Sequence, residues 1–178
     1  MTARGSFWAL FALTLGIYAT MLTWTLPAIA QAAAGLAPFD MRPGGYGFDE
    51  ARKFLAALSP EGLGLYFGAQ QQLDIFYPAL LSATMFWALS ALLPRGLGRW
   101  RFLAATPALV VAGFDYLENH AIAEMLHAGA TGLTIDMVQT ASQWTQLKAQ
   151  STTSVMSALL VLIAWWLVAT RLRRRALA

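Results

Sequence analysis

Long stretches without a charged residue dominate the hydrophobic pattern of this chain. Three of them are long enough to form membrane-spanning helices: residues 6–30, 75–93 and 151–170. A spanning helix needs ~20 mostly apolar residues, because each adds ~1.5 Å and the hydrocarbon core is ~30 Å thick. A fourth apolar stretch, Phe102–Phe114, reaches this length only if its helix continues through Asp115, Glu118 and Asn119. The pattern predicts an all-α, polytopic membrane protein, built as a four-transmembrane-helix antiparallel bundle.

The connections between these stretches predict a single membrane domain over residues 1–178. We expect helices at about residues 6–30, 62–93, 100–127 and 134–171. The first connection, residues 31–61, opens with turn-forming residues. Apolar residues then recur in it at helical spacing: Phe48, Ala51, Leu55 and Leu58. We predict a short periplasmic amphipathic helix that lies on the outer leaflet as an anchor, with a lid role as the alternative.

The composition agrees with a membrane protein. Hydrophobic residues make up 58% of the chain and charged residues only 12%, whereas soluble domains carry about 25% charged residues. Cysteine is absent, which excludes disulfides, iron–sulfur clusters and thiolate zinc sites. Residues 28–30 resemble a signal-peptidase site, but the apolar run before them is longer than a usual signal core. We expect this run to remain as a helix, with cleavage as the alternative.

Basic residues predict the orientation of the helices. They gather before the first helix, in the second connection and after the last helix: Arg4, Arg95, Arg99, Arg101, Arg171, Arg173, Arg174 and Arg175. The positive-inside rule then places both termini in the cytoplasm of a bacterial inner membrane. The net charge of +3 requires no nucleic-acid partner, because anionic lipid would hold these residues. The arginines of the second connection could also grip a phosphate, although their topological role is the simpler interpretation.

Ionisable residues of three predicted helices fall at a similar depth. Counting the helical rise from the cytoplasmic ends places them in the outer third of the membrane or at its outer boundary: Asp74, Asp115, Glu118 and Lys148. Residues three or four apart share a helix face, which defines three polar stripes: Tyr66, Gln70, Asp74 and Pro78; Asp115, Glu118, Asn119 and Ile122; Trp144, Lys148 and Ser151. If these stripes face inward, they form a polar chamber. Pro78, which lacks an N–H, should free the carbonyl of Asp74 to line that chamber.

Three acids and one lysine cannot all stay charged in a low-dielectric chamber. A neutral acid beside an ionised one suits paired acid and base steps. We therefore hypothesise a protein that binds or isomerises a lipid or isoprenoid-like apolar substrate entering from the outer leaflet, with no metal or other cofactor. The catalytic candidates are Asp115 and Glu118, with Asp74 tuning them or sharing the proton. The substrate-binding candidates are Asn119, Lys148, Gln70, Trp144 and Tyr66, and Lys148 also balances charge.

Other interpretations of the polar residues stay open. Buried Asp–Lys pairs and amides also hold membrane helices together without doing chemistry. The chain would then be a non-enzymatic accessory subunit of a larger membrane complex, or part of a homo-oligomer. His120, Glu124 and His127 share a helix face and could ligate a metal. Their depth places them outside the membrane, where a solvated face is the simpler interpretation.

Two motifs resemble an uncharacterised family of small bacterial four-helix inner-membrane proteins: Asp74-Ile75-Phe76-Tyr77-Pro78 and Phe114-Asp115-Tyr116-Leu117-Glu118-Asn119. The resemblance covers most of residues 38–148 and implies a four-helix membrane fold but no activity. In size and layout the chain is also similar to the emopamil-binding (EXPERA) superfamily, which includes sterol isomerases and sterol-binding proteins. This second likeness is architectural. It carries over no catalytic residue and agrees with proton transfer to a lipid.

Overall fold

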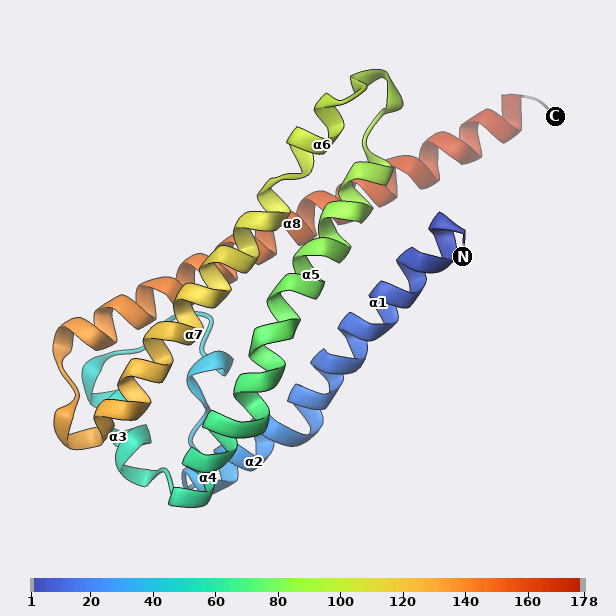
Figure 1. The fold of residues 1–178 in the computed structure, drawn as a ribbon. Coiled ribbons are helices and arrows are strands. Elements are labelled where there is room, and N and C mark those ends of the chain that lie inside the picture. Colours follow the sequence, from blue (N-terminus) through green and yellow to red (C-terminus); the bar gives the residue numbers. More distant parts are fainter. Residues whose placement is uncertain (1, 177–178) are drawn as a thin grey trace.

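The computed structural model describes residues 2–176, with side chains described through residue 172. Helices and their connections make up this part of the chain, and it contains no strand. Four helical rods run alternately up and down (Figure 1). Their elements are α1 (Ala3–Thr20), η1 (Met21–Thr25) and α2 (Leu26–Ala32); α4 (Pro60–Leu65), η3 (Tyr66–Gln70) and α5 (Gln71–Leu92); α6 (Trp100–Ala105) and α7 (Pro107–Gly132); and α8 (Ile135–Ala176). The all-α antiparallel arrangement predicted from the sequence is therefore present.

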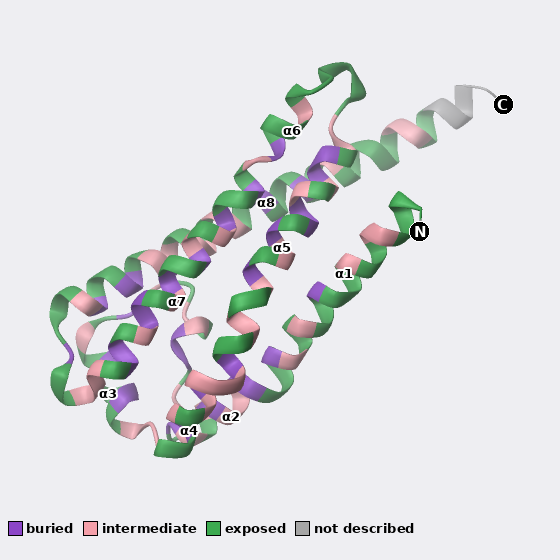
Figure 2. Cartoon of the chain, viewed as in Figure 1, coloured by how far each residue is buried: buried purple, intermediate pink, exposed green. Residues whose placement is uncertain are grey.

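Three of these rods are long and apolar enough to cross a membrane: Ala3–Ala32, Pro60–Leu92 and Ile135–Leu172. Only 11% of the apolar window of the last rod, and 22% of that of the first, is buried inside the protein. The exposed faces of α1 and of the far half of α8 are visible in Figure 2. An apolar surface of this extent is typical of helices that face lipid.

The third rod is not among those long and apolar enough to cross a membrane. It also consists of two helices, α6 and α7, where a single helix was predicted. Its helix breaks at Thr106, because Pro107 lacks the N–H that a continuous helix would use; the N–H and hydroxyl of Thr106 both donate to Leu103 O instead. Beyond this break α7 continues through Asp115 and Glu118, as its predicted length required, and reaches Gly132. It packs between α5 and α8.

The first connection folds back onto one end of the bundle. It contains the short η2 (Phe39–Met41) and the helix α3 (Phe48–Ala57), which packs against α7 and α8. Ala51 and Phe54 of α3 are fully buried. The predicted amphipathic helix is therefore present, but its apolar face contacts protein instead of lying on a leaflet.

Overpacking distinguishes a docked α3 from a membrane-anchored one. Ala51→Leu should lower the free energy of unfolding by about 1–3 kcal/mol, because Ala51 is fully buried and a larger side chain would overpack the interface. The matched change Ala56→Leu, on the exposed face of the same helix, should alter it by less than about 0.5 kcal/mol. Denaturant unfolding of both variants in detergent measures the difference. Equal, small effects would mean that α3 is not docked.

The interior consists of two apolar clusters with a polar layer between them. One cluster lies at the end that carries the first connection and includes Phe39, Phe54 and Met125. The other lies toward the opposite end and includes Met85, Val111 and Leu159. Along α5, α7 and α8 the ionisable residues occupy positions between the members of these clusters. The candidate site is therefore a layer across the bundle rather than a scattered set of polar groups.

Candidate functional site

Lys148 is the centre of a buried charge cluster. Its ammonium group forms ion pairs with two carboxylates on the facing side of α7, Glu118 and, at 3.5 Å, Asp115. The Glu118 side chain is 0% exposed, that of Asp115 7%, and that of Lys148 21%. The structure therefore brings together the three charged residues that the helical spacing placed on facing stripes.

Asp74 belongs to a second part of the same layer. The Gln70 amide donates to both carboxylate oxygens of Asp74, at 3.0 and 3.1 Å. The Thr25 hydroxyl donates to the Gln70 carbonyl oxygen at 2.5 Å. Asn119 joins the two parts, because its amide nitrogen lies 3.3 Å from both Asp74 O and Asp115 Oδ1. A chain of hydrogen bonds and ion pairs, which passes through the backbone carbonyl of Asp74, thus links all four rods.

The Thr25–Gln70 contact is made where two π-helical turns, η1 and η3, meet. A π-helical turn adds one residue to a helical turn, and such turns are frequent at functional sites. Both residues are 0% exposed. Neither turn was predicted from the apolar pattern, and Thr25 was not among the predicted site residues.

Pro78 frees the carbonyl of Asp74, as predicted, but it does not break the helix, because α5 continues through it to Leu92. Since residue 78 has no N–H, the carbonyl of Asp74 is left without its usual helical partner. The amide of Asn119 donates to that carbonyl, and the Tyr116 hydroxyl donates to the next carbonyl, Ile75 O, at 2.8 Å. The proline therefore creates the acceptor through which α7 holds α5.

A double-mutant cycle tests this coupling. Asn119→Ala should lower the free energy of unfolding by about 1–2 kcal/mol, because it removes donors from two buried acceptors. Pro78→Ala restores a backbone donor for Asp74 O, so the loss caused by Asn119→Ala should be smaller in that background, with a coupling of about 0.5 kcal/mol or more. Unfolding of the two single variants and the double variant gives the coupling. Additive effects would show that the Asp74 carbonyl is not the shared partner.

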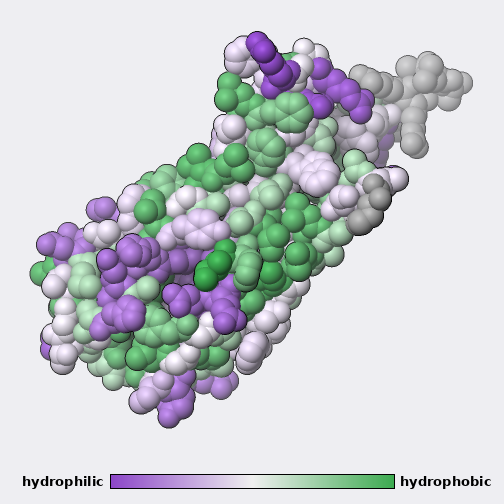
Figure 3. Space-filling model, viewed as in Figure 1, coloured by the Kyte–Doolittle hydropathy of each residue, from purple (hydrophilic) through white to green (hydrophobic). Residues whose placement is uncertain are grey.

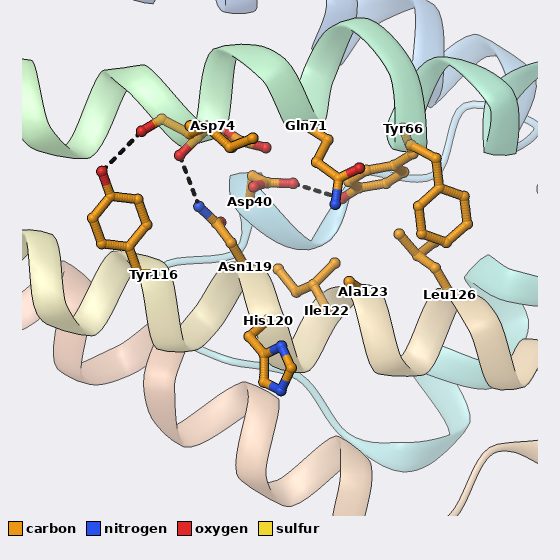
Figure 4. Close-up of a pocket in the computed structure, with 12 residues that line it drawn as sticks. Asp40, Tyr66, Gln71, Asp74, Tyr116, Asn119, His120, Ile122, Ala123 and Leu126 are labelled. Atoms are coloured by element: carbon orange, nitrogen blue, oxygen red, sulfur yellow. Dashed lines mark hydrogen bonds between the residues drawn. The ribbon is translucent and has the colours of Figure 1, made fainter.

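A pocket of about 140 Å³ opens between α5 and α7 on the Asp74 side of the layer. Figure 4 shows Asp40, Asp74 and Asn119 at this pocket, beside Tyr66. Asp40, carried by η2 of the first connection, accepts a hydrogen bond of 2.5 Å from the Tyr66 hydroxyl. Much of the remaining lining is apolar: Phe67, Ile75, Ile122, Ala123 and Leu126. The pocket therefore presents two carboxyl groups in a wall that is otherwise largely apolar but also includes Gln71, Tyr116 and His120.

The predicted site residues divide between the pocket and the cluster. Tyr66, Asp74 and Asn119 line the pocket, whereas the three charged residues of the Lys148 cluster do not. Gln70 is buried behind Asp74, and its neighbour Gln71 lines the pocket instead. Trp144 stacks on Phe114 with ring centroids 6.0 Å apart, away from the pocket lining.

Asp40 is the site residue that sequence reasoning missed. In the sequence it is one of several charges in a turn-rich connection, and no helical spacing relates it to Asp74. Its place depends on how the loop is held. Gly45, at φ +83°, lets the loop approach α8 so closely that a Cβ there would lie 2.5 Å from Ser142 Oγ. The next residue, Tyr46, donates its N–H to the same oxygen at 2.9 Å.

Tyr46 also packs beside the polar layer, between the first connection and α8. Its ring is buried and packs on the ring of Phe39, with centroids 4.8 Å apart. Phe39 is the residue directly before Asp40. Burial raises the pKa of the Tyr46 phenol above its ordinary value, so the hydroxyl stays protonated. The hydroxyl lies beside Thr145, one turn of α8 before Lys148. The loop thus packs against the part of α8 that leads to Lys148, and its hydrogen bond to α8 is the one from Tyr46 N–H to Ser142.

The histidine stripe does not form one site. His120 and Glu124 pair at 3.5 Å with side chains 76% and 56% exposed, while His127 stacks on Phe67 at 4.4 Å. Within the described residues, no group of three or more His, Cys, Asp or Glu side chains is arranged to hold a metal ion. In the view of Figure 3, hydrophilic side chains gather over α7 and the adjoining part of α5, the two helices between which the pocket opens.

Comparison of the chain with models of protein families, with curated proteins and with solved structures gave no match. The fold and the site alone therefore define the class: an all-helical protein with three helices apolar enough to cross a membrane, a polar layer across the bundle, and a pocket beside it.

Proposed function

We propose that the chain is a four-pass integral protein of the bacterial inner membrane, with both termini in the cytoplasm. We further propose that it binds a lipid or isoprenoid-like apolar molecule in the α5–α7 pocket and moves a proton on it. The observation that carries this proposal is the pair of carboxyl groups, Asp40 and Asp74, in a largely apolar pocket. A purely structural layer has no need of a pocket that exposes two acids.

The size and surroundings of the pocket favour a long apolar ligand. Its volume of about 140 Å³ is below the ~300 Å³ at which pockets begin to enclose a drug-sized molecule. Only a segment of a lipid-like chain would enter it. The rest would lie against exposed apolar side chains at the pocket, such as Ile75 (54% exposed) and Tyr116 (41% exposed), where membrane lipid would surround it.

The proposed chemistry uses the two acids as a pair. Carboxyl groups facing one low-dielectric pocket share a proton more easily than they hold two negative charges. The protonated member gives its proton to one carbon of a double bond, and the other removes a proton from the allylic carbon. The double bond moves by one position and no other reactant is consumed. This assignment leaves Asp115 and Glu118, the first candidates from the sequence, as charge partners of Lys148.

Solvent deuterium tests the proposal directly. The purified chain is reconstituted in vesicles made from the total lipid extract of its host and incubated in D2O. Mass spectrometry then follows carbon-bound deuterium in each unsaturated lipid. We expect one lipid class to gain deuterium only when the protein is present. A lipid that co-purifies with the protein but gains no deuterium would leave binding in place and remove the chemistry; no enrichment of any lipid would remove both.

A non-enzymatic accessory subunit is the second candidate. It is favoured by the closed Lys148 cluster, in which both carboxylates are paired and neither lines the pocket. This candidate predicts that a larger complex co-purifies with the chain. It also predicts that Asp40→Asn and Asp74→Asn leave the cellular lipids unchanged, whereas the enzyme proposal predicts accumulation of the unconverted lipid in both variants.

A further inference from the structure

A second hollow, of about 300 Å³, lies at the opposite end of the bundle, at the corner between α5 and α6. Its walls are Trp87, Ser90, Ala91, Arg95, Arg101 and Phe102. Arg95 belongs to η4 (Arg95–Leu97) and Arg101 to α6. Hydrophilic side chains gather at this corner in Figure 3, at the end of the bundle where α1 begins in Figure 1. None of these residues takes part in the polar layer.

Ser90 supplies a buried hydrogen-bond donor without an acceptor. It is 5% exposed, and its hydroxyl has no partner among the described residues. Other helical hydroxyls here donate to the carbonyl four residues back, as those of Thr84 and Ser154 do at 2.7 and 2.8 Å. The hydroxyls of Ser82 and Tyr46 are also buried without a partner among the described residues, but neither residue lines a hollow. Buried polar groups are nearly always paired, so Ser90 points to a ligand atom in the hollow that accepts a hydrogen bond.

The arginines supply positive charge that the chain does not neutralise locally. Residues 75–114 contain no Asp or Glu. Among the described side chains, no ion pair involves Arg95 or Arg101. The Arg101 guanidinium lies over the Phe102 ring, 4.7 Å from its centroid, which leaves its N–H groups available at the edge. Two guanidinium groups and a hydroxyl around one hollow are the donors that bind a phosphate, often in bidentate fashion.

We propose that this hollow binds the phosphate of an anionic membrane lipid. Arg95 and Arg101 contact the phosphate oxygens, and Ser90 donates to one of them. The aromatic walls favour a lipid over free phosphate, because Trp87 and Phe102 are 36% and 44% exposed and offer apolar surface to the start of an acyl chain. The site is independent of the α5–α7 pocket, so it stands or falls separately from the function proposed above.

Native mass spectrometry of the delipidated full chain in detergent tests the site. Titration with dioleoyl phosphatidylglycerol should show one lipid retained most tightly. Arg95→Gln or Arg101→Gln should weaken its binding about tenfold, the effect of losing one charge-assisted hydrogen bond. Ser90→Ala should weaken it about threefold, because a neutral hydrogen bond contributes less. Arg99→Gln is the matched control, since Arg99 is exposed in the same connection but does not line the hollow; it should change binding by less than about twofold.

Three results would overturn the proposal. The Arg99 variant could lose as much affinity as the Arg101 variant, which would mean that surface charge alone attracts the lipid. Dioleoyl phosphatidylcholine, which has no net charge, could bind as tightly as phosphatidylglycerol. Inorganic phosphate could stabilise the chain against heat as well as the lipid does, which would make the ligand a free phosphate and not a lipid.

Discussion

Replacing Lys148 by methionine is expected to lower the free energy of unfolding by about 3–5 kcal/mol, the cost of leaving a buried charge without its partner. Glu118 is 0% exposed and pairs with Lys148, and the 7% exposed Asp115 shares the same ammonium group. Methionine fills most of the lysine volume but supplies no charge. Both carboxyl groups must then take up protons or draw in water, and either response weakens the contact between α7 and α8.

Three further variants show that charge, and not volume, is responsible. Lys53→Met makes the same substitution at an exposed position of α3 and should change stability by less than about 0.5 kcal/mol. Adding Glu118→Gln and Asp115→Asn to Lys148→Met removes the unpaired charges and should recover most of the loss. Equilibrium unfolding in detergent, or the yield of folded chain after heating, measures all of them. If Lys148→Met unfolds like the natural chain, the cluster does not hold the bundle together.

The sequence was sufficient to predict the layout of the rods and the level at which polar groups meet. Helical spacing puts Asp115 and Glu118 on the same face of α7, one turn apart, and the apolar stretches fix the direction of each helix. Together they place Lys148 at a depth similar to that of both carboxylates, and the structure shows the inward-facing stripes on which their meeting depended. The same reasoning placed a free carbonyl at Asp74, because the effect of Pro78 is local to its own helix.

The features that sequence reasoning missed depend on contacts between distant segments. Asp40 reaches the pocket only because the first connection folds back and Gly45 approaches α8. The π-helical turn that carries Gln70 to Thr25 adds one residue to the helical turn, which shifts the face presented by every residue before it. A strict count of three and four residues cannot anticipate such a change of register.

Substitutions in the Lys148 cluster and in the pocket should affect different measurements. The cluster is closed, so its contribution is to stability and to the position of α7. The pocket is open, and its acids contact whatever enters it. Among the described residues, Asn119 connects the cluster to the pocket, because its amide donates to both Asp115 and the backbone carbonyl of Asp74. Asp115→Asn should therefore alter the free energy of unfolding more than the rate of the proposed proton transfer.

Asp74→Asn should reduce deuterium transfer to the lipid by about 10²–10⁴-fold, the contribution of a positioned proton donor or acceptor. The fold should survive, because the asparagine oxygen can still accept the hydrogen bond that Gln70 donates to Asp74. Asp40→Asn should cause a loss of the same order, since each proton shuttle needs both members of the pair. Asp136→Asn, at an exposed position near the start of α8, is the control and should leave the rate unchanged. The measurement is the rate at which the exchanging lipid class gains deuterium in D2O, compared among the three variants and the natural chain. If the Asp74 and Asp40 variants exchange deuterium as fast as the control, the pocket acids bind the ligand without moving its protons.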